Sequence, residues 1–401
     1  MNLPPIMKLR FMPSLLSTLL VLGISVSGTV MAKPNNELST QDTFKPYLCE
    51  GNGIISHTDG VSTLNTLKYF GTSITIDVYN SKPEQADPAL CHALNVVQEY
   101  HYLASNYSTY PHVENIKSIN NSPASIHKID PKLTALIAAG LDWYNKSDGY
   151  FNIALSPVID LWRKHRSECK GEIKENGLCT KPEMAELQNA AKLVNVKDIY
   201  LNQADNTIRL KTGMSIDLGG IAKGWMAEKV YEQLKAEGLT SFMINAGGNI
   251  RHYGLHPDGR EFNTAIEDPL CKKYDYQLPK CSEFDGQYHE VVHGTDLTIV
   301  SSGNYLRYYR VNEKEYHHLI DPKTLQPKPE GVSTSVVLDG QQIFADVIST
   351  TLFLMPLEQA LDFANKYNYV EAVWYLDDEG KKVSSGRFDI YRFKPEVHDK
   401  N

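Results

Sequence analysis

The spacing of apolar residues along the chain predicts helices interleaved with short strands. Leu90, Leu94 and Val97 recur at helical spacing, which predicts an amphipathic helix over 88–103. Other runs that predict helices lie at 131–146, 182–194, 225–234, 344–353 and 357–367. Alternating or short apolar runs predict strands at 67–79, 199–201, 207–210, 242–244, 298–301, 316–320, 333–338 and 372–376. With no internal repeat and no long linker, this order predicts an α/β or α+β sandwich.

Two predicted segments contain an interruption. Gly71 lies inside the strand expected at 67–79 and indicates a bulge or a close approach of the backbone to a neighbour. The apolar segment at 150–162 is expected to be buried and broken at Pro157.

The N-terminal 32 residues have the pattern of a secretory signal peptide. Lys8 and Arg10 precede an apolar stretch at 15–26, and small residues predict cleavage near Ala32. An uncleaved membrane anchor is the alternative, but the apolar stretch is shorter than the roughly 20 residues that a spanning helix needs. We therefore expect export to the periplasm and no stable membrane insertion.

The composition is that of a globular protein, with 42% apolar and 22% charged residues. The formal net charge is −8, and loss of the signal segment, which carries two basic and no acidic residues, makes it −10. This acidic balance argues against nucleic acid as a partner. The segment 33–66 is expected to be a polar leader and N-terminal extension, followed by one elaborated domain or two lobes.

All six cysteines follow the signal segment, and an even number favours disulfides in an oxidising compartment. Two local pairs bracket polar, lysine-rich insertions, and two cysteines remain as a long-range pair. A metal site is the alternative, but no C-x-x-C or histidine spacing supports it. The expected pairs are Cys169–Cys179, Cys271–Cys281 and, after them, Cys49–Cys91.

The run DLGGIAKG at 217–224 carries the most informative candidate chemistry. It leaves a β-like stretch and enters an apolar, helix-forming run, so its glycines let a ligand approach the backbone closely. A helix N-terminus favours a phosphate, and Lys223 adds a full positive charge. With Asp217, the run predicts a phosphate-containing ligand accompanied by a metal; an ordinary structural turn is the alternative.

Asp346 and Thr350 are four residues apart, so on a helix they share one face. A carboxylate and a hydroxyl are hard oxygen ligands of the kind that Mg²⁺ accepts. The alternative is an Asp near a helix N-terminus and a Thr that bonds to its own backbone. A second glycine-rich turn, 245–250, follows an apolar strand and is also compatible with a plain hairpin.

His317 and His318 are adjacent in a predicted strand. Neighbouring positions of a strand face opposite sides, so at most one of the two is expected to face a given site. A structural role for that histidine is the alternative.

Taken together, these stretches resemble the FAD:protein FMN transferases, the ApbE-like family. The resemblance runs from about Leu67 to Met355. Its motifs occur in the family's order: Gly71-Thr72, Ser108-Thr109-Tyr110, 147–151 leading to Leu161-Trp162, DLGGIAKG, NAGGNI at 245–250, Ser302-Gly303-Asn304-Tyr305, HLIDPKT at 318–324 and ADVIST at 345–350.

The resemblance implies a two-lobed α/β sandwich over 67–390, with FAD between the lobes and a C-terminal tail at 391–401. It implies that Asp346, Thr350 and the backbone carbonyl of Gly220 hold Mg²⁺, and that His318 is the base. The residues that the resemblance places against FAD are Phe70, Tyr110, Ala154, Leu155, Ser156, Asp217, Lys223 and Ile320.

The implied reaction is the Mg²⁺-dependent transfer of FMN from FAD to a Ser or Thr hydroxyl of an exported acceptor flavoprotein, with release of AMP. Two alternatives remain. With water as the acceptor, the same site would hydrolyse FAD to FMN and AMP. Without turnover, the protein would be a periplasmic flavin-binding protein.

The chain departs from the family at four positions. Asn152, Asn249 and Asn304 stand where the family usually has Asp, which removes negative charge with little change of shape. Leu325 stands where the family has Gly, and because Leu does not readily adopt a positive φ, we expect this turn to differ.

Overall fold

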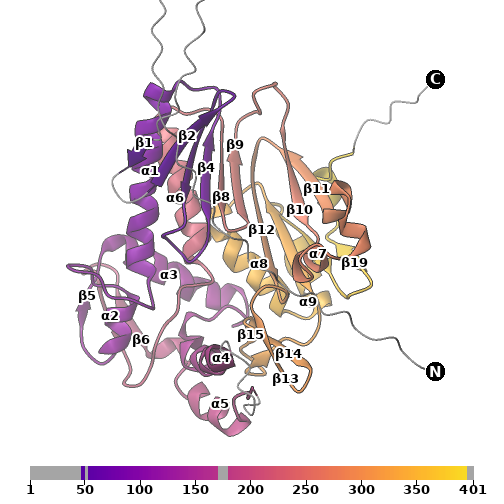
Figure 1. The fold of residues 1–401 in the computed structure, drawn as a ribbon. Helices are drawn as coiled ribbons and strands as arrows, with labels where there is room; N and C mark the ends of the chain where they lie inside the picture. The colour runs from indigo at the N-terminus through magenta and orange to yellow at the C-terminus, as the bar shows by residue number, and fades with distance from the viewer. Residues whose placement is uncertain (1–46, 50–52, 170–178, 395–401) are drawn as a thin grey trace, which may run out of the picture. The chain divides into compact units, whose positions relative to one another are not determined.

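The computed structural model describes residues 47–49, 53–169 and 179–394, all of which belong to one unit, 45–401 (Figure 1). Within these residues, ten strands form one sheet in which every neighbouring pair is antiparallel. In sheet order they are β1 (Tyr47–Cys49), β2 (Gly53–Thr58), β3 (Val61–Thr66), β4 (Ile74–Val78), β8 (Phe242–Ala246), β9 (Asn249–Tyr253), β12 (Asp296–Gly303), β17 (Ser333–Leu338), β18 (Val370–Tyr375) and β19 (Lys382–Ser384).

Four helices pack against this sheet and against one another in turn. They are α1 (Pro83–Ala104), α6 (Ala222–Ala236), α8 (Ala345–Leu354) and α9 (Leu357–Lys366). Strand β17 is buried on both faces: Val336 and Leu338 join the core under the helices, whereas Val337 joins a second cluster on the opposite face. This two-sided burial explains why β17 ends in three consecutive apolar residues, 336–338.

The opposite face of β12, β17 and β18 is covered by the hairpin of β10 (Phe262–Glu267) and β11 (Tyr288–Gly294). The mixture of helices and sheet confirms the α/β class predicted from the sequence.

Most of the remaining elements lie below the main sheet in Figure 1, among them the helices α2 (Ile116–Asn121), α3 (Pro131–Lys146), α4 (Ser156–Cys169) and α5 (Met184–Ala191). Helix α7 (Pro269–Lys273) lies instead beside β10 and β19. Small sheets are formed by β5 (His127–Lys128), β6 (Ile199–Asn202) and β7 (Thr207–Leu210), by β13 (Tyr308–Val311) and β14 (Lys314–His317), and by β15 (Ile320–Asp321) and β16 (Gln326–Pro327). The 3-10 turns are η1 (Ile153–Leu155), η2 (Val196–Asp198), η3 (Pro279–Cys281), η4 (Phe284–Gln287), η5 (Gln342–Phe344) and η6 (Phe388–Ile390).

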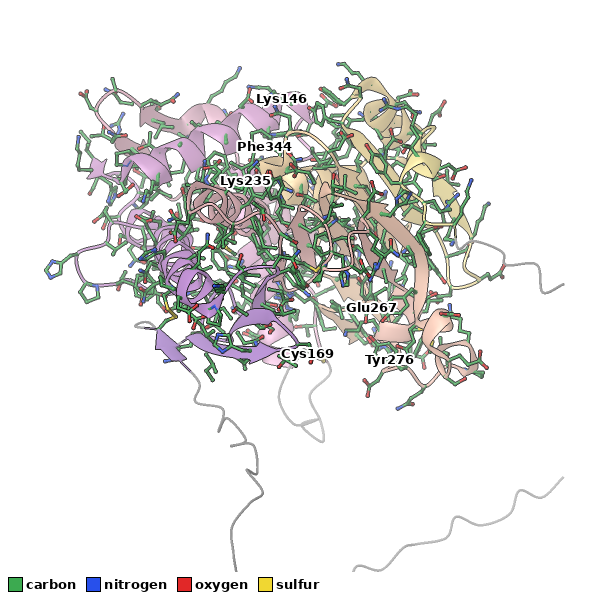
Figure 2. The ribbon with its side chains drawn as sticks, turned by 90° about the horizontal axis from the view of Figure 1, so that it is seen from above. Lys146, Cys169, Lys235, Glu267, Tyr276 and Phe344 are labelled. Atoms are coloured by element: carbon green, nitrogen blue, oxygen red, sulfur yellow. A yellow bond between two sulfur atoms is a disulfide. The ribbon has the colours of Figure 1, made fainter. Side chains whose placement is uncertain are left out.

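The end of α3 packs against η5, just before α8. Lys146 and Phe344 are both labelled in Figure 2, and the Lys146 Nζ lies 6.0 Å from the Phe344 ring centroid. The Trp143 ring lies 5.3 Å from the same ring. These contacts tie α3 to the start of the helix that carries Asp346.

Helix α3 has the predicted bounds because Asp130 caps it and Pro131 occupies its first position. Four other predicted segments differ from the structure. The strand expected at 67–79 begins only at Ile74, because Phe70 and Gly71 form a turn with φ of 56° and 62°.

The strand expected at 316–320 is divided between β14 and β15, so His318 lies between two strands. Pro157 does not break the segment 150–162; it lies in the first turn of α4, where the missing N–H costs no hydrogen bond. Helix α6 begins at Ala222, earlier than expected, which places Lys223 in its first turn.

The described part of 33–66 belongs to the main sheet, since β2 and β3 pair with each other and β3 pairs with β4. Residues 1–32, the predicted signal peptide, lie outside the described residues. In the part of the chain that is described, no helix combines the length and apolarity needed to cross a membrane.

The structure confirms the three expected disulfides. Cys49–Cys91 joins β1 to α1. Cys169, labelled in Figure 2 at the end of α4, is bonded to Cys179. Cys271–Cys281 closes the loop between β10 and β11, and both of its cysteines are buried.

Candidate active site

A cavity of about 330 Å³ lies where the glycine run, α4, α8 and the chain from β12 to β15 meet. It brings together residues that are far apart in the sequence. The predicted site residues that line it are Phe70, Leu155, Asp217, Gly220, Lys223, His318, Ile320, Asp346 and Thr350.

Asp346 lies in the first turn of α8 and is almost completely buried. Its Oδ2 accepts a hydrogen bond from the Gly224 N–H (2.6 Å), and its Oδ1 accepts one from Asn249 Nδ2 (2.5 Å). The Lys223 Nζ lies 3.5 Å from Oδ1. The carboxylate is therefore fixed in position by the start of α6 and by the β8–β9 turn.

The two glycine-rich motifs allow this close approach. A Cβ on Gly224 would lie 3.3 Å from the Asp346 carboxylate, and one on Gly220 would lie 3.0 Å from the Phe151 ring. Gly247 and Gly248 have φ of 61° and 91°, which the turn between β8 and β9 requires. The segment 245–250 is thus a hairpin, and it also supplies Asn249 to the site.

Thr350 lies one turn after Asp346 and lines the same cavity. Its Oγ1 is 3.3 Å from the Ser302 hydroxyl on β12, which also bonds the Ser349 hydroxyl (2.9 Å). Asp346 and Thr350 therefore share a helix face, as their spacing predicted.

The residues expected to hold Mg²⁺ are chemically suited to it. A carboxylate offers about four lone-pair positions, and three groups approach those of Asp346, so Oδ2 retains acceptor capacity. The Thr350 hydroxyl and the Gly220 carbonyl would add hard oxygen atoms. The described residues contain no cluster of three or more His, Cys, Asp or Glu side chains that could hold a metal. The predicted ligand set is of another kind, because Asp346 is its only residue of these four types.

Asp217 fixes the start of the glycine run. Its Oδ1 accepts a hydrogen bond from the Gly219 N–H (2.7 Å), and its Oδ2 accepts from Arg163 Nη2 (2.8 Å) and Asn106 Nδ2 (3.2 Å). The sequence analysis missed Arg163, because it ended the buried segment one residue earlier. The sequence feature that could have indicated Arg163 is the i, i+3 spacing of Asp160, Arg163 and Arg166, which places the three side chains on one helix face.

The adjacent histidines have different surroundings. The buried His317 is held at both nitrogens: Nε2 lies 2.7 Å from the Lys328 carbonyl, and Nδ1 accepts from the Leu319 N–H (3.2 Å). His318 lines the cavity, and within the described residues its Nδ1 has no hydrogen-bond partner. Burial lowers the pKa of His318 to about 3, and the nearby Arg307, His317 and Arg166 act in the same direction. The imidazole is therefore neutral and able to accept a proton.

Not all of the residues that were predicted to contact the flavin line the cavity. Tyr110, Ala154 and Ser156 are described but lie outside the lining of the cavity. Tyr110 lies behind Phe70, because His101 accepts the Phe70 N–H (3.2 Å) at Nδ1 and bonds the Tyr110 hydroxyl (3.1 Å) at Nε2. No sequence motif indicated this role of His101.

The ApbE family model matches residues 70–374, which include both glycine-rich turns, the histidine pair and Asp346. The chain belongs to the ApbE family. It is 27% identical over 337 residues to the FAD:protein FMN transferase of Treponema pallidum, covering 80% of this chain and 86% of the relative. It is also 27% identical over 251 residues to the FAD:protein FMN transferase of Vibrio cholerae, covering 62% of this chain and 68% of the relative.

Solved structures of ApbE proteins share the fold. The Thermotoga maritima ApbE protein aligns with a TM-score of 0.69 at 23% identity, covering 83% of this chain and all of that one. The Vibrio cholerae flavin transferase ApbE aligns with a TM-score of 0.65 at 22% identity, covering 82% and 99%.

The three Asn positions that depart from the ApbE pattern share one feature: each amide nitrogen donates to an oxygen. Asn249 donates to Asp346, Asn152 to the Val194 carbonyl (3.2 Å), and Asn304 to the Gly331 carbonyl (2.9 Å). An ionised Asp could make none of these bonds, because it has no donor. The substitutions therefore add structural hydrogen bonds as well as removing charge.

The expectation that Leu325 would force a different turn was wrong. Leu325 has a φ of 63°, so it adopts the left-handed conformation that the family fills with Gly. Its N–H donates to the Asp321 carbonyl (2.8 Å), its carbonyl accepts from Trp162 Nε1 (2.9 Å), and its side chain packs against the cluster that contains Leu155. These contacts offset the strain.

Proposed function

We propose that this protein transfers FMN from FAD to a Ser or Thr hydroxyl of an exported protein in a Mg²⁺-dependent reaction that releases AMP. Membership of the ApbE family and the names of the relatives support flavin transfer. The observation that carries the proposal is the cavity in which Asp346, Lys223, Thr350 and the neutral His318 meet.

The reaction exchanges one phosphorus–oxygen bond for another. The acceptor hydroxyl oxygen attacks the FMN-side phosphorus of FAD, a phosphoester forms, and the bond to the AMP oxygen breaks. His318 takes the hydroxyl proton, and AMP leaves with the electron pair. Such a positioned base contributes about 10²–10⁴ in rate.

The negative charge of the pyrophosphate is neutralised by the site. Lys223 faces the cavity and would contact a phosphate oxygen. Asp346, Thr350 and the Gly220 carbonyl would hold Mg²⁺, which supplies Lewis-acid stabilisation when bound. The buried hydrogen bonds of Asp346 keep the carboxylate in place before any ligand arrives.

We further propose that the protein acts in the periplasm after removal of the signal peptide. Three disulfides, which include all six cysteines, support an oxidising compartment.

Incubation of the purified protein with FAD and MgCl₂ tests the function, with and without an exported apo-flavoprotein as the acceptor. Transfer predicts acceptor-dependent AMP release and flavin fluorescence that stays with the acceptor under denaturing conditions. Acceptor-independent AMP release would instead indicate hydrolysis, and flavin binding without AMP would indicate a binding protein.

A further inference from the structure

The cavity carries an excess of positive charge although the protein is acidic. Four cationic side chains line it, Arg163, Arg166, Lys223 and Arg307, against two carboxylates, Asp217 and Asp346. The chain as a whole has a formal net charge of −8. The excess is therefore local to this cavity.

Two of the four cations are already paired. Arg163 bonds Asp217 (2.8 Å) and Asp160 (2.5 Å), and Lys223 faces Asp346. Arg166 and Arg307 have no ion pair and no side-chain hydrogen bond within the described residues. The two uncompensated guanidinium groups thus belong to the same cavity but to different elements, α4 and the turn before β13.

These two arginines are close enough to repel each other. Burial lowers the pKa of Arg166, and Arg163 and Arg307 lower it further. Arg307 also acts on Lys223 and on His318. Like charges held together in a cavity without counter-charges are unfavourable until an anion binds between them.

We propose that Arg166 and Arg307 form an anion subsite that binds the pyrophosphate of the dinucleotide. This rests on the proposed function for the identity of the ligand. A pyrophosphate diester is dianionic and matches the two unpaired charges. Planar guanidinium groups bind phosphate through paired N–H donors, and the same contacts stabilise the charge that develops on the leaving phosphate.

The acidic side chains of an acceptor protein are the competing occupant. The observations favour the phosphate, because both arginines line the same cavity as Lys223 and His318; Arg166 is partly exposed there and Arg307 is exposed.

Calorimetric binding without Mg²⁺ tests the subsite in the absence of turnover, with ADP, FAD and riboflavin as probes. Arg166→Gln and Arg307→Gln should each weaken ADP and FAD about 10-fold or more, as expected for a lost charged hydrogen bond, and should leave riboflavin within about twofold. Arg166→Lys should recover part of the loss. Arg310→Gln is the matched control, because Arg310 is exposed like Arg307 and lies close to it in β13, but it pairs with Glu315 and does not line the cavity.

Three results would overturn the subsite: unchanged ADP and FAD affinity in both variants, an equal loss for riboflavin, or a raised KM for the acceptor alone. The last would assign the arginines to acceptor docking. The outcome is separable from that of the proposed function, because ADP affinity does not require turnover. A protein that releases no AMP but loses ADP affinity in both variants would retain the subsite and lose the transferase assignment.

Discussion

The two sides of the cavity are held in different ways. On the side of α6 and α8, hydrogen bonds from Gly224 and Asn249 lock Asp346, and Lys223 balances its charge. On the side of α4 and β13–β15, Arg166 and Arg307 have no acidic partner within the described residues, and the Nδ1 of His318 has no partner. The first side is complete without a ligand, whereas the second is electrostatically incomplete.

This difference separates two requirements of phosphoryl transfer. Metal ligands must be preorganised, because their reorganisation would add to the barrier. Cations that no protein carboxylate neutralises gain the most from binding a substrate anion. Burial is the main cause of the low pKa of His318, and the unpaired Arg307 and Arg166 lower this pKa further because they disfavour the protonated form.

The largest effect is expected on the locked side. Asp346→Asn should reduce AMP release at saturating FAD by roughly 10²–10³-fold or more. Either orientation of the new amide places an NH₂ group against the Gly224 N–H or against the Asn249 and Lys223 donors. The variant should also lose about 1–3 kcal/mol of stability, measured by urea unfolding.

Thr350→Val is the control for this side, because it removes one neutral oxygen and preserves the packing. It should reduce turnover in the same direction but less. Wild-type turnover in Asp346→Asn would remove the basis for the metal site, whatever its stability.

The second prediction concerns the histidine pair. His318→Ala should reduce transfer about 10²-fold and change FAD affinity little, because it removes the proposed base. His317→Ala should cost about 1–3 kcal/mol of stability through two lost hydrogen bonds, with near-normal transfer per folded molecule. Single-turnover rates corrected for the folded fraction separate the two; equal losses of rate would mean that the pair acts as one unit.

The third prediction tests whether a ligand completes the incomplete side. Bound ADP should raise the pKa of His318 above its value of about 3, because its phosphates neutralise Arg166 and Arg307, while burial continues to hold the pKa below the ordinary value. A group whose pKa rises on binding takes up a proton, so ADP affinity should increase as pH falls through the pKa of the bound state. NMR titration of the His318 ring with and without ADP measures the shift. An unchanged pKa would contradict the compensation of charge.

The locked side was predictable from sequence, but the incomplete side was not. Local geometry can be predicted from short-range spacing in the sequence, as for Asp346 and Thr350 on one helix face and for the glycines of 217–224 at a turn. Arg166 and Arg307 matter because neither has an acidic partner within the described residues. A sequence does not show whether an arginine is paired. Only tertiary contacts distinguish them.

The hydrophobic pattern also failed to predict two other features, a polar strand inside the sheet and the backbone conformation at Leu325. Strand β3 contains Val61 and Leu64 among Ser, Thr and Asn, so its polarity favoured a leader over a sheet strand. Leu325 was expected to avoid a positive φ, and the intrinsic preference was overridden by the contacts of its backbone and side chain.

The smallest effect is expected at Leu325, on the incomplete side of the cavity. The left-handed conformation costs an L-residue about 1–2 kcal/mol, and Gly avoids this cost. Loss of a half-buried Leu side chain costs a similar amount, about 1–2 kcal/mol. The two terms nearly cancel, and the added freedom of Gly in the unfolded chain leaves Leu325→Gly with a net cost of about 0.5–1 kcal/mol in the free energy of unfolding.

Leu193 provides the matched comparison, because it is also half-buried and packs against the main core, but its φ is not positive. Leu193→Gly relieves no strain and adds the conformational entropy of Gly to the unfolded state, so it should cost about 2–3 kcal/mol. Urea unfolding measures the loss of stability in both variants. If Leu325→Gly costs as much as Leu193→Gly, the turn after Asp321 stores no strain, and the Leu side chain holds this side of the cavity by packing alone.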